Sequence, residues 1–181
     1  MAEAQNETYA GQLQSQFLQI IDGLALADLQ KRFLRDRWLD QLLWFEGKSA
    51  YNQRRYYAVR LMLIVGGVTV PALVSLDIRQ HDVTETLAWA TFAISLVVAM
   101  AAALEAFFDY GGRWRTFRRT AEALKAHGWQ FFELAGPYAA TDHAAAFPSF
   151  AAHVETLVQQ NVEAFIAQAT QAQAAKTPAG G

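Results

Sequence analysis

The residues that could do chemistry lie on one face of an apolar stretch in the middle of the chain. At about 100° per residue on a helix, small and hydroxylated side chains fall within roughly one third of the circumference, and two carboxylates follow at the end of that face. A ring of carboxylates at the mouth of a water-filled path favours cations. Its candidate pore-lining residues are Thr84, Thr91, Ser95, Ala102, Glu105 and Asp109.

The same face has a second interpretation, which the sequence leaves open. Small residues also let two helices approach closely, and hydroxyl groups bond across such an interface. The two carboxylates could instead pair with Arg60 or Arg113, or be exposed at a membrane surface. Because two helices cannot enclose a pore, the pore interpretation requires a homo-oligomer.

Two charge-free runs, 61–76 and 86–104, must position these residues. Eighteen residues of the second run span roughly 27 Å as a helix, close to the hydrocarbon thickness of a bilayer. The first run reaches that length when 56–60 is added, since tyrosines suit the interface and Arg60 extends toward headgroups. We expect two transmembrane helices in an all-α integral membrane protein. The alternative is a buried hairpin in a soluble bundle.

The charges on either side of the two runs predict an orientation. The segment 77–85 is short, so it should be a tight loop between the two helices. It holds three acids and one arginine, so it should lie outside the cell. Arginines concentrate on the other flanks, and positive flanks remain in the cytoplasm. They are Arg54, Arg55, Arg60, Arg113, Arg115, Arg118 and Arg119. Both termini should therefore be cytoplasmic, and the first transmembrane helix should serve as its own insertion signal, because no cleavable signal peptide is visible.

Helical patterns on both sides of the hairpin complete the expected organisation. Cytoplasmic helices are predicted in 1–55 and 110–168, around a transmembrane hairpin at 56–109 and before a disordered tail at 169–181. The apolar stripe between Phe150 and Phe165 needs a partner, within the chain or in a coiled coil across subunits. We expect packing between subunits, since one short chain offers little partner surface.

The sequence gives no sign of an enzyme. It has no cysteine, and its four histidines lack the spacing of a metal site. No phosphate-binding glycine loop, nucleophile elbow or metalloprotease motif occurs. The net charge of −2 gives no reason to expect nucleic acid as a partner. No cofactor and no metal are predicted.

Three blocks of residues carry a resemblance to a family. They are 36–57, 108–138 with its Trp114, Phe117-Arg118 and Gly136-Pro137-Tyr138, and 147–166. Together they resemble the SLATT-type bacterial proteins, two-transmembrane effector domains associated with nucleotide-signalled defence. The resemblance covers about residues 30 to 168. It implies a pore in the bacterial inner membrane, opened through nucleotide-linked activation. The chain carries no sensor domain, and the acid expected after the family's helix is replaced by Ala126-His127-Gly128.

The expected function is therefore an oligomeric membrane pore or ion-channel-like protein with a preference for cations. Its partners would be the lipid bilayer, other copies of the chain, and ions. The alternative is a non-conducting membrane scaffold whose cytoplasmic helices recruit a partner.

Overall fold

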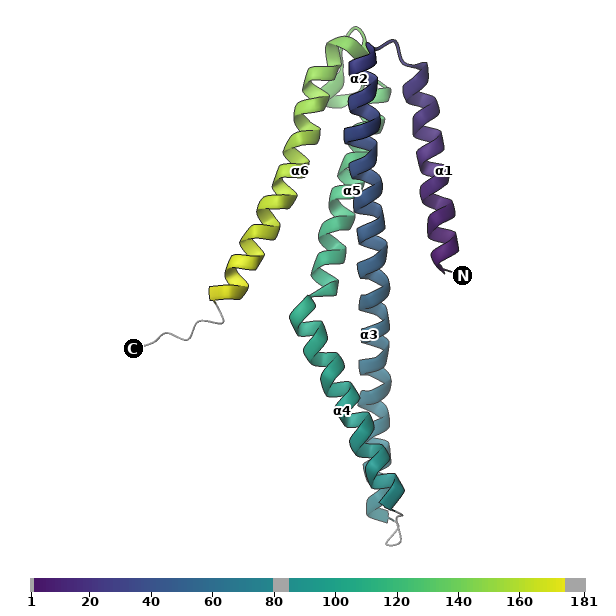
Figure 1. The fold of residues 1–181 in the computed structure, drawn as a ribbon, viewed down its shortest axis with the longest axis vertical. Helices are drawn as coiled ribbons and strands as arrows, with labels where there is room; N and C mark the ends of the chain where they lie inside the picture. The colour runs from purple at the N-terminus through teal and green to yellow at the C-terminus, as the bar shows by residue number, and fades with distance from the viewer. Residues whose placement is uncertain (1, 80–84, 175–181) are drawn as a thin grey trace, which may run out of the picture. The chain divides into compact units, whose positions relative to one another are not determined.

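The computed structural model describes residues 2–79 and 85–174, which form helices and their connections (Figure 1). The all-α prediction is confirmed for these residues. Thr84, most of the predicted loop at 77–85, and positions 175–181 of the predicted tail lie outside them. In chain order the elements are α1 (Ala2–Gly23), α2 (Asp28–Phe33), a π-helical turn η1 (Leu34–Leu39), α3 (Asp40–Arg79), α4 (Glu85–Phe108), α5 (Tyr110–Phe132), a 3₁₀ turn η2 (Gly136–Tyr138) and α6 (His143–Ala174).

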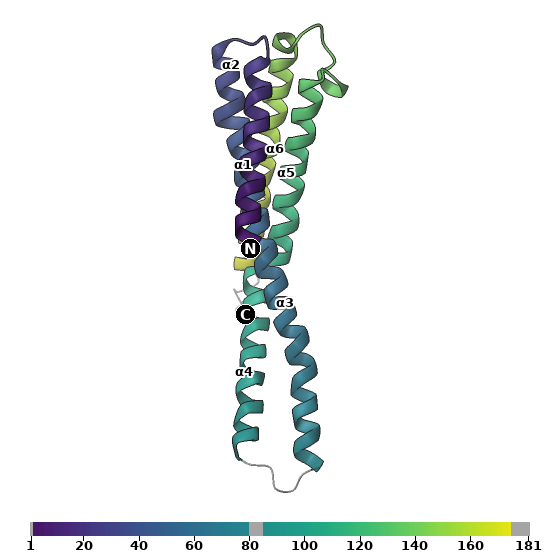
Figure 2. The same ribbon diagram turned by 90° about the vertical axis from the view of Figure 1, so that its right-hand side faces the viewer.

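The chain divides into two compact units. The bundle unit lies in 1–48 and 116–181, and the hairpin unit in 49–115. In the bundle unit, α1, α5 and α6 run beside the segment that leads from α2 into α3 (Figure 2). One aromatic and aliphatic core joins these four segments. Each fully buried large side chain in it contributes about 1.5–3 kcal/mol. Its largest fully buried members are Trp38, Tyr138, Phe17, Phe45, Phe131 and Phe150.

The π-helical turn η1 carries two side chains, Trp38 and Arg37, that bind other helices of the bundle unit. Trp38 is fully buried, and its indole N–H donates to the carbonyl oxygen of Leu124 at 3.0 Å. A Cβ on Gly128 would lie 2.2 Å from the Trp38 ring, so only glycine permits this approach. Arg37 binds the Glu155 carboxylate through two hydrogen bonds of 2.8 Å and so ties η1 to α6.

The core corrects the expectation that the apolar stripe of α6 packs between subunits. Phe150 and Val154 are fully buried within one chain, against residues of α1, η1 and α5. Four amphipathic segments in one chain supply enough partner surface. Further along α6, Val162 and Ile166 are exposed.

The N-terminal helical pattern is interrupted once. The sequence predicts helix from about residue 8 to 47, whereas α1 ends at Gly23 and α2 begins at Asp28. Ala27 is extended there, and its N–H donates to the Gln30 side chain at 3.1 Å, which caps α2. From Asp28 onward the helix continues through η1 and α3 without a gap, as the absence of proline before Pro71 predicts.

The hairpin unit contains the two apolar helices, α3 from residue 49 onward and α4, which run side by side (Figure 1). Both are long and apolar enough to cross a membrane. Only 6% of the most apolar 18-residue window of each is buried. Two helices alone cannot cover each other, so their large apolar side chains remain exposed.

Candidate functional site

The two faces of α4 differ in the exposure of their side chains. Large apolar side chains are exposed on one face, with Trp89 at 64% and Phe107 at 67%. Of the candidate pore-lining residues on the other face, Thr91, Ser95 and Glu105 are half-buried, whereas Ala102 is exposed. The structure therefore brings three polar candidates to the edge of a helix contact.

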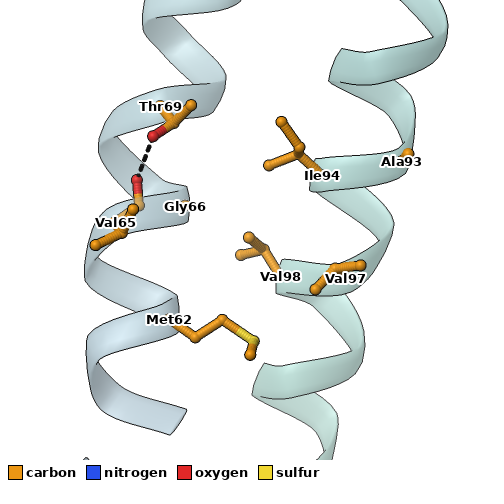
Figure 3. A pocket seen from close by; sticks show the side chains of 8 residues that line it. All are labelled: Met62, Val65, Gly66, Thr69, Ala93, Ile94, Val97 and Val98. Atoms are coloured by element: carbon orange, nitrogen blue, oxygen red, sulfur yellow. Dashed lines mark hydrogen bonds between the residues drawn. The ribbon is translucent and has the colours of Figure 1, made fainter. Parts of the chain in front are cut away.

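The contact between α3 and α4 is closest at Gly66. A Cβ on this glycine would lie 2.1 Å from the Val98 Cγ2 atom, so the α3 backbone touches a side chain of α4 directly. Ile94 and Val98 point toward α3 beside it (Figure 3). An apolar groove of about 400 Å³ follows this contact. It is lined by Met62, Val65, Gly66, Thr69, Ala93, Ile94, Val97 and Val98.

Glu105 lies on the face of α4 that contacts α3. It follows the buried Ala101 by four residues and Val98 by seven, which places the three on one side of the helix. Its Oε2 atom is buried and has no hydrogen-bond partner among the described residues. The ion pair with Arg60 or Arg113 that the sequence left open is not formed in this part of the chain. A carboxylate oxygen without a partner is costly in apolar surroundings.

The hydroxyl groups in the contact between α3 and α4 form hydrogen bonds within their own helices. Ser95 Oγ donates to the Thr91 carbonyl oxygen at 2.8 Å, within one turn of α4. On α3, Thr69 Oγ1 makes the same kind of bond to the Val65 carbonyl oxygen (Figure 3). Such bonds let hydroxyl side chains lie in an apolar interface without a water or ion.

Asp109 does not continue the α4 face. The helix ends at Phe108, and Asp109 has a positive φ of 44°. Its Oδ1 accepts the Gly112 N–H at 3.0 Å, so the carboxylate caps the start of α5. The chain therefore turns at Asp109, two residues before Gly111-Gly112. The helical face that was predicted to end in two carboxylates therefore ends at Glu105.

An aromatic collar, defined as Tyr56, Tyr57 and Trp114, joins α3 to the start of α5. The Tyr56 and Trp114 rings stack with centroids 5.9 Å apart, and Tyr57 lies 5.8 Å from Trp114. A Cβ on Gly111 would lie 2.9 Å from the Tyr56 ring, so glycine permits this packing. The sequence indicates that the two tyrosines suit a membrane interface but does not predict their contact with Trp114.

The bundle unit holds a cluster that the sequence missed, formed by His127, Tyr138 and His153. His127 Nδ1 lies 2.6 Å from Tyr138 Oη, and the two imidazole rings stack at 5.3 Å. Burial and then the nearby His153 lower the pKa of His127, while burial raises the pKa of Tyr138 to about 12. Near pH 7 the tyrosine hydroxyl therefore donates to a neutral imidazole. No group of three or more His, Asp or Glu among the described residues could hold a metal ion.

A charged network ties α3 to α5 in the same unit. Glu46 is 8% exposed, and its carboxylate pairs with Lys125 Nζ at 2.5 Å and with Arg118 at 3.3 Å. Glu122 binds the same two cations. Burial, the largest effect, lowers the pKa of Lys125, but the hydrogen bonds that its ammonium group donates to Glu46 and Glu122 raise it, and the net pKa lies above the usual value of 10.5. These charges are paired, which is typical of a structural role.

Comparison with known families assigns the chain to a group without assigning it an activity. The model of a protein family of unknown function, DUF4231, matches residues 40–146. The chain belongs to this family. The match begins with α3, includes α4 and α5, and ends in the first turn of α6. No curated protein and no solved structure matches the chain significantly. The matched residues include the apolar hairpin and α5, and function has to be argued from their geometry.

Proposed function

We propose that the α3–α4 hairpin spans a bilayer, and that several copies assemble around a cation pathway whose mouth carries Glu105. The observation that carries this proposal is the Glu105 carboxylate itself. It follows an apolar run without charge, and one of its oxygens is buried without a partner. An ionisable residue in such a place marks a functional site more often than a structural one.

The uncovered apolar surface supports insertion into a membrane. α4 has 24 residues, which corresponds to about 36 Å of helix against a hydrocarbon core of about 30 Å. Soluble monomers rarely leave so large an apolar surface in water. The arginine excess on the flanks supports an orientation with both termini in the cytoplasm. The resemblance to the SLATT-type proteins supports the bacterial inner membrane as the location.

The position of Glu105 supports the proposed assembly of several copies. The residue is only half-buried, so part of its side chain faces away from α3. In a ring of hairpins these partly exposed carboxylates can share a water-filled path, where their charge attracts cations. The exposed opposite face of α4, with Leu96 and Met100, suits lipid.

Conductance of the purified full chain in planar bilayers tests this proposal. Glu105→Gln keeps the shape of the side chain and removes its charge. Because an acidic ring concentrates cations at a pore mouth, we expect its loss to lower the cation-to-anion permeability ratio roughly several-fold. Glu133→Gln makes the same chemical change on an exposed residue of the bundle unit and should conduct like the wild type. Equal selectivity in all three proteins would remove Glu105 from the pathway.

A non-conducting scaffold is the second candidate. Thr91 and Ser95 are half-buried, and the Ser95 hydroxyl is satisfied within its own helix, which favours a packing role for this face. A scaffold predicts no current at any voltage. It also predicts that a partner protein co-purifies with the bundle unit and is lost when that unit is disrupted.

A further inference from the structure

A proline interrupts the backbone hydrogen bonds of α3 in the middle of its apolar run. Pro71 lies inside the helix, which continues beyond it to Arg79. In an α-helix each backbone carbonyl accepts the N–H of the residue four positions later. Because proline has no N–H, the Gly67 carbonyl oxygen does not receive this hydrogen bond. In a bilayer such an oxygen needs another partner.

Gly67 leaves this carbonyl group accessible. The residue is exposed, and a Cβ built on it would meet nothing within 4 Å in the described part of the chain. The adjacent Gly66 is buried against Val98 instead. One glycine of the pair therefore permits the helix contact, while the other has no side chain to cover a backbone oxygen that Pro71 leaves without its usual donor.

The Gly67 carbonyl lies on the side of α3 that faces away from the apolar groove. At about 100° per residue, Val65 and Gly67 lie on opposite sides of Gly66. Val65 lines the groove (Figure 3). Arg60 is on the Gly67 side too, but about 10 Å nearer the arginine-rich flank. Since 61–76 holds no charged residue, this carbonyl has uncharged surroundings on α3.

Ser95 of α4 lies on this same side of the hairpin. Val97 lines the groove, whereas Ser95 lies about 60° around α4 from Val98 in the opposite direction. Ser95 precedes Val98 by three residues, which is about 4.5 Å toward the C-terminal end of the antiparallel α3. The Gly67 carbonyl points toward that end as well, so the two oxygens lie at a similar depth. The Ser95 hydroxyl donates its proton to the Thr91 carbonyl, which leaves its oxygen as an acceptor.

We propose that the Gly67 carbonyl and Ser95 hydroxyl oxygens bind a monovalent metal cation, such as K⁺ or Na⁺, inside the pathway. Backbone carbonyls that lack a helical donor coordinate such ions in channels and transporters. Two oxygens from one chain cannot replace a hydration shell, so neighbouring copies complete the site with the same two groups. The inference rests on the proposed function. It adds α3 to the pathway and turns the apolar groove toward lipid.

The dependence of single-channel conductance on KCl concentration measures this site in the full chain. Pro71→Ala restores the N–H that bonds the Gly67 carbonyl, so the half-saturating KCl concentration should rise roughly several-fold. Pro148→Ala makes the same chemical change inside α6, in the bundle unit, and should leave that concentration unchanged.

Two hydroxyl groups on opposite sides of the hairpin provide a second, independent comparison. Ser95 and Thr69 each donate to the carbonyl four residues earlier, but Thr69 lines the groove. Ser95→Ala should raise the half-saturating concentration, whereas Thr69→Val should conduct like the wild type. This pair decides the question if Pro71→Ala does not assemble.

Two results would overturn the cation site. They are a wild-type half-saturating concentration in Ser95→Ala, and an equal shift in Ser95→Ala and Thr69→Val. The Glu105→Gln protein separates this failure from failure of the proposed function, because its expected change is in ion selectivity. Lower selectivity in Glu105→Gln with unchanged saturation in Pro71→Ala and Ser95→Ala removes the cation site alone. A wild type that passes no current removes both proposals.

Discussion

Glu105 and His127 are ionisable side chains whose surroundings, more than their types, decide what they do. Glu105 has an unpartnered carboxylate oxygen between apolar helices. His127 is half-buried and hydrogen-bonded in the bundle unit. The buried oxygen of Glu105 therefore destabilises the fold, which is typical of a functional residue. His127 is compatible with its surroundings as long as its imidazole is neutral.

The lowered pKa of His127 predicts that the bundle unit loses stability in acid. Because the folded pKa lies below the ordinary value of 6.5, the unfolded chain binds the additional proton first as the pH falls. The loss begins near pH 6.5 and grows until the folded pKa is passed. Hydrogen exchange of α5 amides in the full chain at pH 7.5 and 5.5 measures it. His127→Gln should reduce the difference between the two pH values.

The ion pair between Arg37 and Glu155 titrates at a lower pH than His127, so the two contributions to stability can be separated. The hydrogen bond from Arg37 lowers the pKa of Glu155 below 4.5, so that contribution is present above pH 4.5 and is lost only as the pH falls further. It cannot explain a change between pH 7.5 and 5.5. An unchanged pH response in His127→Gln would contradict the role of His127.

Sequence reasoning found the residues of the α4 face but not their geometry. Thr91, Ser95 and Glu105 are all half-buried, although Glu105 lies several turns further along α4. Asp109 departs from the face because its carboxylate caps α5 at a positive φ, and this local competition is not visible in periodicity. That the Glu105 oxygen lacks a partner depends on which side chains α3 presents, which one sequence does not reveal.

At the scale of helices, the packing of α3 on α4 depends on one glycine of an adjacent pair. Gly66→Ala places a methyl group 2.1 Å from the Val98 Cγ2 atom, and a β-branched valine in a helix cannot easily turn away. A Cβ on Gly67 meets nothing within 4 Å. We expect Gly66→Ala to destabilise the hairpin by about 1–3 kcal/mol relative to Gly67→Ala.

Thermal unfolding of both glycine variants in one detergent measures this difference. The two changes are identical in composition and in helix propensity, so any gap between them reports the contact with Val98. Equal midpoints for the two variants would mean that the helices do not pack at Gly66.

The helices themselves were largely predictable, because long charge-free runs and amphipathic stripes determine where each lies. The bounds of α4 agree with the apolar run, whereas α3 extends on both sides of its run, from Asp40 to Arg79. The break before α2 was not predicted, since it depends on a cap that Gln30 supplies to Ala27.

At the scale of the whole molecule, the sequence could not decide which stripes pair with which. The stripe of α6 was expected between subunits, yet Phe150 and Val154 complete a core within one chain. An apolar stripe on a helix indicates that another surface must cover it, but not whether that surface belongs to the same chain or to another copy. The proposal of an oligomer now depends on the hairpin, where large apolar side chains are exposed and the buried Glu105 Oε2 atom has no hydrogen-bond partner among the described residues.

The most direct test of the membrane hairpin uses single cysteines, which the cysteine-free chain allows. The positions are Asp82 in the predicted loop, Ala99 in α4 and Ala152 in α6, the last two both exposed. An impermeant thiol reagent should label only the Asp82→Cys protein on intact cells, and also the Ala152→Cys protein once the membrane is opened. The Ala99→Cys protein should react only in detergent, because the bilayer covers it. Labelling at position 99 whenever position 152 reacts would contradict a membrane-spanning hairpin.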